Sequence, residues 1–181
     1  MQTHDFVILT YGALKGKIYG KTALQKKVYF LGVMLGHDLG YGPHYYGPYS
    51  TQVADANSEL KSLGYLSVIV NARETDSRGF EKARYDFQLT KDGYKLFERK
   101  KKEYSAEWPE FKKAAEVLQK AGDVHYMALT VAAKAYFILN MRGKASLEAI
   151  KKIAREFGWS PSNDELNQAV EFLKKMDLVQ N

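Results

Sequence analysis

The residue types that could carry out catalysis do not form a recognisable set in this sequence. The chain contains no cysteine, which excludes thiolate nucleophiles and cysteine-ligated zinc. None of its four histidines pairs with another at metal-ligand spacing on one helix face. Ser50 lacks the small-x-Ser-x-small elbow of a serine hydrolase, and no pair of carboxylates forms an acid–base constellation. We therefore expect a protein that is not an enzyme and that holds no metal or cofactor.

One short motif, Gly20-Lys21-Thr22, resembles the end of a phosphate-binding loop. That loop needs another glycine five positions before Gly20, and a strand ahead of it. Position 15 is Lys15 instead, and the segment before the motif has the apolar spacing of a helix. The sequence therefore favours a helix start here, with Thr22 and Gln25 forming a capping box.

Basic side chains that could contact phosphates gather between two strand-like runs. The loop from Asn71 to Arg84 alternates arginine and lysine with acidic residues. A net charge of +6, from 27 basic and 21 acidic side chains, allows a weak attraction to a polyanion without demanding one. Because the acids of the loop nearly cancel its cations, a solvated hairpin is the alternative interpretation. The loop residues predicted to contact DNA are Arg73, Arg78, Lys82 and Arg84.

Tyrosines gather around a glycine–proline turn, residues 45–50, which we call the Tyr-Gly-Pro segment. A tyrosine ring is apolar along its body and polar at its tip, and this suits a half-buried position at a protein interface. The residues predicted to contact a partner are Tyr46, Pro48 and Tyr49. The alternative is that these rings only cover the crossing between two helices.

The elements that must position these residues follow in a recognisable order. Apolar residues at helical spacing predict helices over residues 24–35 and 51–63, joined by the glycine- and proline-rich turn. Strand-like runs follow at residues 67–70 and 84–89, with the charged loop between them. Helix, turn, helix, strand, loop and strand is the order of a winged helix-turn-helix. We predict a mainly α fold with a small antiparallel β wing, in which a winged helix-turn-helix precedes a helical C-terminal half.

The helix over residues 51–63 would read the major groove if the protein binds DNA. With its apolar stripe turned inward, the outward residues predicted to contact DNA are Thr51, Ser58 and Lys61. This face carries Asp55 at its centre and no arginine, which counts against sequence-specific readout. A face of this kind suits contact with another protein almost as well.

Two parts are predicted, a winged-helix-like domain at residues 1–104 and a helical domain at residues 105–181 packed on it. Gly20-Lys21-Thr22-Ala23-Leu24 is echoed by Gly143-Lys144-Ala145-Ser146-Leu147. The similarity has two interpretations. Either the second part repeats the three-helix unit of the first without its wing, or the match arises by chance or from similar helix-capping sequences. A further capping box is predicted at Ser162 and Glu165.

A family resemblance rests on three stretches. These are Leu24-Gln25-Lys26-Lys27-Val28-Tyr29-Phe30-Leu31, Tyr46-Gly47-Pro48-Tyr49-Ser50 and Glu59-Leu60-Lys61-Ser62-Leu63-Gly64-Tyr65-Leu66. Together they resemble the YwgA-like prokaryotic proteins and, more distantly, the Panacea domain of SocA-type antitoxins, over about residues 20–90. The resemblance implies a winged-helix-like domain in a bacterium or archaeon. Most YwgA-like members have no assigned activity, Panacea domains act by contacting a toxin or another protein, and no catalytic residue carries over.

Two functions follow from the sequence as alternatives. The first is a non-enzymatic regulator that binds double-stranded DNA through the third helix and the wing. The second is a protein-interaction or antitoxin-like module that uses the Tyr-Gly-Pro surface. No stretch has the roughly 18 apolar residues of a membrane span, and the N-terminus lacks the pattern of a signal peptide. We therefore expect a cytoplasmic protein without a membrane partner; its oligomeric state, a homodimer included, stays open.

Overall fold

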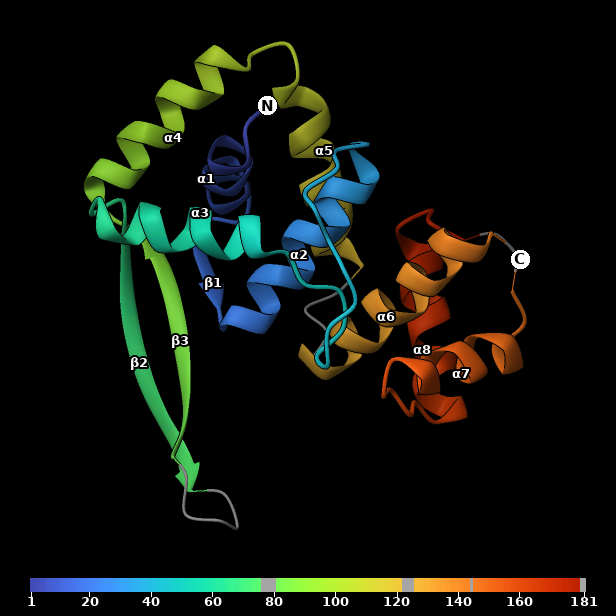
Figure 1. The fold of residues 1–181 in the computed structure, drawn as a ribbon. Helices are drawn as coiled ribbons and strands as arrows, with labels where there is room; N and C mark the ends of the chain where they lie inside the picture. The colour runs from blue at the N-terminus through green and yellow to red at the C-terminus, as the bar shows by residue number, and fades with distance from the viewer. Residues whose placement is uncertain (76–80, 122–125, 144, 180–181) are drawn as a thin grey trace.

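The computed structural model describes residues 1–75, 81–121, 126–143 and 145–179. The described chain is mainly helical, with a small three-stranded antiparallel sheet, as Figure 1 shows. The β2–β3 hairpin projects away from the helices at one side, and α6, α7 and α8 lie together at the other. The elements are α1 (Thr3–Ala13), β1 (Lys17–Tyr19), α2 (Lys21–Met34), α3 (Thr51–Ser62), β2 (Leu66–Thr75), β3 (Glu81–Leu89), α4 (Lys91–Glu103), α5 (Trp108–Lys120), α6 (Tyr126–Arg142), α7 (Leu147–Glu156) and α8 (Asn163–Lys175).

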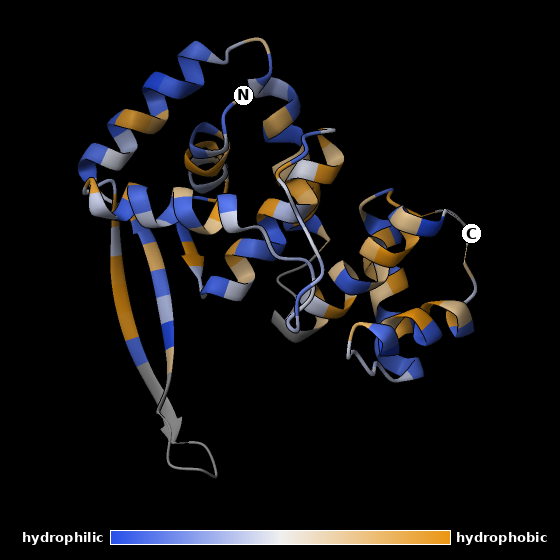
Figure 2. Cartoon of the chain, viewed as in Figure 1, coloured by the Kyte–Doolittle hydropathy of each residue, from blue (hydrophilic) through white to orange (hydrophobic). Residues whose placement is uncertain are grey.

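The sheet has the strand order β1-β3-β2, so β3 lies in the middle. Leu66 pairs with Leu89 at the base of the hairpin, and Ile18 of β1 pairs with Phe87 on the other side of β3. The sequence predicted β2 and β3, although shorter than they are, and missed β1. A strand of three residues beside two glycines carries no periodicity that could reveal it. Figure 2 shows an apolar upper part of β2 beside a more polar β3.

The core is built around α1, which Figure 1 shows between α3, α4 and α5. Phe6, Val7, Ile8 and Leu9 are successive residues and are all buried. A helix buried on all sides needs apolar residues all round rather than a single stripe. The Phe6 ring lies 4.9 Å from the Phe111 ring of α5, so residues after position 104 also contribute to this core.

The start of α2 differs from the prediction. The helix begins at Lys21 with Gly20 as its N-cap, and no side chain caps it. The predicted capping box of Thr22 and Gln25 is therefore wrong. Gln25 is buried instead, where its side-chain amide donates to the Ser50 carbonyl at 2.9 Å and accepts from the Ser50 N–H at 3.0 Å. Gln25 therefore bonds to the backbone of Ser50, 25 residues away, instead of to the start of its own helix.

Two other helices begin with a side-chain cap. Ser50 caps α3, since its hydroxyl accepts from the Val53 N–H at 3.1 Å. The capping box of Ser162 and Glu165 is confirmed at the start of α8. In both places the serine hydroxyl accepts from the backbone N–H three residues farther along the chain.

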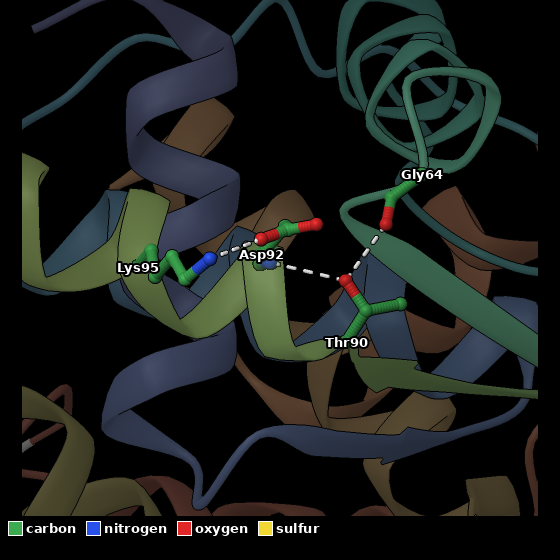
Figure 3. Close-up of polar contacts among 5 residues, drawn as sticks. Gly64, Thr90, Asp92 and Lys95 are labelled. Carbon is green, nitrogen blue, oxygen red and sulfur yellow. Dashed lines mark hydrogen bonds and ion pairs between the residues drawn. The ribbon is translucent and has the colours of Figure 1, made fainter.

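A threonine joins the hairpin base to α4, as Figure 3 shows. The Thr90 hydroxyl donates to the Gly64 carbonyl at 2.7 Å and accepts from the Gly93 N–H at 3.0 Å, while Lys95 pairs with Asp92 at 2.7 Å. One side chain thus caps α4 and fixes the end of the turn that follows α3.

Candidate functional site

A groove lies between the start of α2, the middle of α3 and the inner face of the hairpin. Its volume is about 250 Å³, and the residues that define it are Lys21, Asn57, Ser58, Lys61, Val68 and Tyr85. The floor is apolar, because Val68 lies on the same sheet face as Phe87, its register partner. We call this feature the basic groove.

Two lysines give the basic groove its charge. Lys21 opens α2 and Lys61 lies in the last turn of α3, and both are exposed. The Lys21 Nζ lies 4.2 Å from the centroid of the Tyr85 ring, a cation–π distance. Among the described residues that line the groove, none is acidic. The arrangement therefore favours an anion over a cation.

The outer face of the sheet carries other cations, which are already engaged. Lys17 and Arg84 flank the Tyr19 ring, at 4.9 and 5.6 Å from its centroid. The Arg84 Nη2 donates to Asp86 at 2.7 Å, and Asp86 is only 3% exposed. The Arg84 Nε also lies 2.7 Å from the other carboxylate oxygen of Asp86, without the alignment of a hydrogen bond. The charge of Arg84 is therefore largely balanced within the sheet.

The residues predicted to contact DNA fall into separate places. Ser58 and Lys61 line the basic groove. Thr51 is exposed at the start of α3, seven residues before Ser58 and therefore about 10 Å along the helix axis. Arg84 is half-buried beside Asp86.

The remaining predicted DNA contacts lie farther along the hairpin. Arg73 of β2 and Lys82 of β3 are register partners, which places them opposite each other on the hairpin. Arg78 lies outside the described residues.

Lys21 and Tyr85 are among the groove residues that were not predicted to contact DNA. Lys21 was considered only within a phosphate-loop motif that does not fit. For Tyr85 a signal existed, because strand alternation places it on the same face as Phe87 and Leu89, which are buried. Only the tertiary structure brings the start of α2 beside that face.

The Tyr-Gly-Pro segment is held by hydrogen bonds from two distant helical regions. The Lys26 Nζ of α2 donates to the Pro48 carbonyl at 2.7 Å. The Trp159 Nε1, just after α7, donates at 2.9 Å to the carbonyl of His44, the residue directly before the segment. The segment thus fastens α2 to the C-terminal helices.

The predicted partner residues of this segment differ in accessibility. Tyr46 is 59% exposed and its neighbour Tyr45 is 69% exposed, with their rings 4.9 Å apart. Tyr49 is half-buried, and Pro48 is buried. The accessible part of the segment therefore consists chiefly of Tyr45 and Tyr46.

Lys26 is an unusual residue, because only 1% of it is exposed. Burial, followed by the nearby charge of Lys134, lowers the pKa of Lys26 to about 7. Gly47 lies between the two side chains with φ +86°, and a Cβ on it would lie 3.0 Å from Lys134 Cγ. Burial also lowers the pKa of Lys134, whereas Glu165 opposes that shift. A buried amine of this kind exchanges its proton near neutral pH.

A buried phenol lies on the same helix. The Tyr29 hydroxyl has no hydrogen-bond partner among the described residues. Its ring packs against Tyr41 at 5.0 Å and Tyr136 at 6.5 Å. Burial, then the proximity of Tyr136, raises the pKa of Tyr29, so this group remains neutral at physiological pH.

The described ranges show neither a metal centre nor a membrane span. Within them no three metal-binding side chains gather at one point, and no helix is sufficiently long and apolar to cross a bilayer.

Comparison with known proteins gives no match, either to a family model or to a curated protein. The resemblance to YwgA-like proteins and to Panacea domains therefore stays a prediction from the residues that suggest it.

Proposed function

We propose that this protein is a non-enzymatic regulator that binds double-stranded DNA through α3 and the β2–β3 hairpin. The element order α1, β1, α2, α3, β2, β3 supports a winged helix-turn-helix, in which α3 would be the reading helix and the hairpin the wing. A helix of this size fits the major groove. Such a regulator would act in the cytoplasm of a bacterium or archaeon, as the family resemblance implies.

The basic groove is the observation that carries this proposal. It places Lys21 and Lys61 beside the exposed residues of α3, with no acidic residue in the described lining. The β2–β3 hairpin, which contributes Val68 and Tyr85 to the groove, projects away from the helices (Figure 1). Cations on a concave surface next to an exposed helix suit the polyanionic backbone of a duplex.

The composition of α3 indicates which contacts would dominate. Asp55 is exposed on it, and no arginine is present to read guanine. Glu59 is a second exposed acid of α3, and its Oε2 lies 2.6 Å from the His4 Nε2. Binding would therefore depend mainly on phosphate contacts, and it would vary little with base sequence.

A salt titration tests the proposal. A short fluorescent duplex should be retained by the protein at low salt, and the affinity should fall steeply between about 50 and 200 mM salt. Fluorescence anisotropy measures both quantities. No change in anisotropy at the lowest salt, with protein that is folded by circular dichroism, would exclude duplex binding.

A second candidate function is a protein-interaction module that uses the Tyr-Gly-Pro segment. It is supported by the exposure of Tyr45 and Tyr46 on a segment that Lys26 and Trp159 hold in place. Aromatic side chains on a rigid support lose little conformational entropy on binding. Tyr46→Ala should abolish capture of the partner without altering thermal unfolding, and a partner that binds the variant equally well would remove this candidate.

A further inference from the structure

We propose that the basic groove seats one backbone phosphate of the bound nucleic acid, between Lys21, Lys61 and the first turn of α2. This inference rests on the proposed function, because it specifies where the duplex is held. The site is not a phosphate-binding loop, because position 15 is a lysine where such a loop requires a glycine, although β1 directly precedes Gly20. It is assembled from two helices and a sheet face.

The first turn of α2 borders the groove, because Lys21 and Leu24 line it. An α-helix leaves its first backbone N–H groups without intrahelical partners, and here no side chain caps them. Gly20 adopts φ +95°, and Leu24 is the first residue whose N–H bonds back, to the Gly20 carbonyl at 3.1 Å. The N–H groups before Leu24, together with the helix dipole, favour an anion at this end.

The two lysines supply the second set of contacts, and of the two only Lys61 comes from an element other than α2. Lys61 comes from the opposite wall of the groove, in α3, and Lys21 is held over the Tyr85 ring. Both are exposed at the rim, where either ammonium can turn toward a phosphate oxygen. A phosphate that binds both ammonium groups would therefore lie between the two walls of the groove.

The size and lining of the groove fit a phosphate with part of its sugar. A volume of about 250 Å³ exceeds the need of a bare phosphate. Val68 and Phe87 offer an apolar floor, and Ser58 offers a hydroxyl on the wall of α3. Asn57 is fixed in the wall, because its Oδ1 accepts from the Tyr11 hydroxyl at 2.7 Å.

The neighbouring cations of the outer sheet face are poorer candidates for this role. Arg84 is paired with Asp86, and Lys17 lies along the Tyr19 ring on the other side of the sheet. A phosphate held by the outer face would compete with the Asp86 carboxylate for Arg84. The groove imposes no such competition.

Substitutions that remove the charge of a lysine test the proposed phosphate site. Lys21→Gln and Lys61→Gln should each lower the slope of log K against log salt by about 1, and the double variant should lose about tenfold in duplex affinity at low salt. Lys152→Gln is the matched control, because it removes one exposed lysine from α7, away from the groove. If the double variant binds the duplex with an unchanged slope of log K against log salt, the proposed phosphate site is wrong, although DNA binding itself remains supported.

Backbone amide chemical shifts provide the second measurement. The duplex should move the amide signals of residues 21–24, and inorganic phosphate or adenosine monophosphate should move the same signals at higher concentration. If the nucleotide moves them and no duplex binds, the phosphate site stands and the proposed DNA function falls. If a saturating concentration of duplex leaves the chemical shifts of these amides unchanged, the proposed phosphate site is wrong.

Discussion

Lys21 and Lys26 lie five residues apart on the same helix and have opposite environments. Lys21 is exposed at the rim of a groove, over the ring of Tyr85. Lys26 is 1% exposed and donates to the Pro48 carbonyl. Five residues turn an α-helix by about 140°, so the two side chains leave nearly opposite sides of α2. One side is available for an anionic partner, and the other fastens the Tyr-Gly-Pro segment.

The difference shows that the two lysines contribute to different properties. An exposed lysine adds to the surface potential at little cost in stability. A buried lysine has lost its hydration, and its hydrogen bond to a carbonyl only partly compensates for that loss. We therefore expect substitutions at Lys21 to change binding and substitutions at Lys26 to change stability.

The largest expected effect is on folding stability. Lys26→Ala should lower the free energy of unfolding by about 2–4 kcal/mol, because it leaves a cavity and an unpaired Pro48 carbonyl. Lys21→Ala should change it by less than about 0.5 kcal/mol. Chemical denaturation measures both values. Equal losses in the two variants would contradict the contrast between the two sides of α2.

The pH dependence of stability gives the next largest effect. The pKa of Lys26 is lowered to about 7 in the folded protein, so above that pH the unfolded chain binds more protons than the folded one. Stability should therefore rise between about pH 7 and 9, with a contribution from Lys26 of at most about 1.4 kcal/mol per pH unit. The half-buried Lys134, whose pKa is also lowered, adds in the same direction.

Lys26→Met should remove most of this rise, whereas Lys21→Met should retain it. Denaturation at several pH values below 10 measures the slope. Above that range the buried tyrosines, whose pKa values are raised, reverse the trend because they ionise first in the unfolded chain. A slope that Lys26→Met leaves unchanged would show that Lys26 keeps its proton in the fold.

A smaller effect is expected at Gly47, which lies between Lys26 and Lys134. Gly47→Ala places a Cβ 3.0 Å from Lys134 Cγ in addition to the strain of φ +86°. Gly143→Ala is the control, since it has φ +73° and no atom of the described residues lies within 4 Å of the added Cβ. Left-handed strain of about 1–2 kcal/mol should appear in both variants, and only Gly47→Ala should lose about 1 kcal/mol more. Identical losses of stability in the two variants would show that the contact between Gly47 and Lys134 tolerates the added methyl group.

The smallest effect belongs to the outer face of the sheet. Lys17→Gln should cost less than about 1 kcal/mol, because a cation–π contact at an exposed ring contributes little. If the basic groove holds the phosphate, this variant should also bind the duplex almost as the unmodified protein does. A loss of affinity equal to that of Lys21→Gln would move the interface to the outer face.

Some of these features could be predicted from the sequence, and others could not. The capping box of Ser162 and Glu165 is confirmed because both partners lie within one helical turn. The same pattern at Thr22 and Gln25 failed, because Gln25 reaches Ser50 across a gap of 25 residues. Nothing in the local pattern distinguishes the two cases. The prediction of a mainly helical chain with an antiparallel hairpin is confirmed at that level.

The candidate site was only half predictable for a related reason. Ser58 and Lys61 could be placed on the outward face of α3 from periodicity alone. The groove that includes them also needs Lys21 and Tyr85, which belong to other elements. Arg84 looked like a phosphate contact, yet its partner Asp86 lies two residues away on the same strand face, and this spacing was readable in the sequence.

By itself the sequence determined the helices, the hairpin and the residues that face inward, because these depend on spacing and on capping within a few residues. Tertiary structure alone decided that Lys26 is buried and Lys21 is not, that Gln25 leaves its own helix start uncapped, and that three elements enclose a basic groove. Such outcomes depend on how much water each side chain loses and on which distant backbone atoms replace it. Those quantities are set only when α2, α3, the sheet and the C-terminal helices come together.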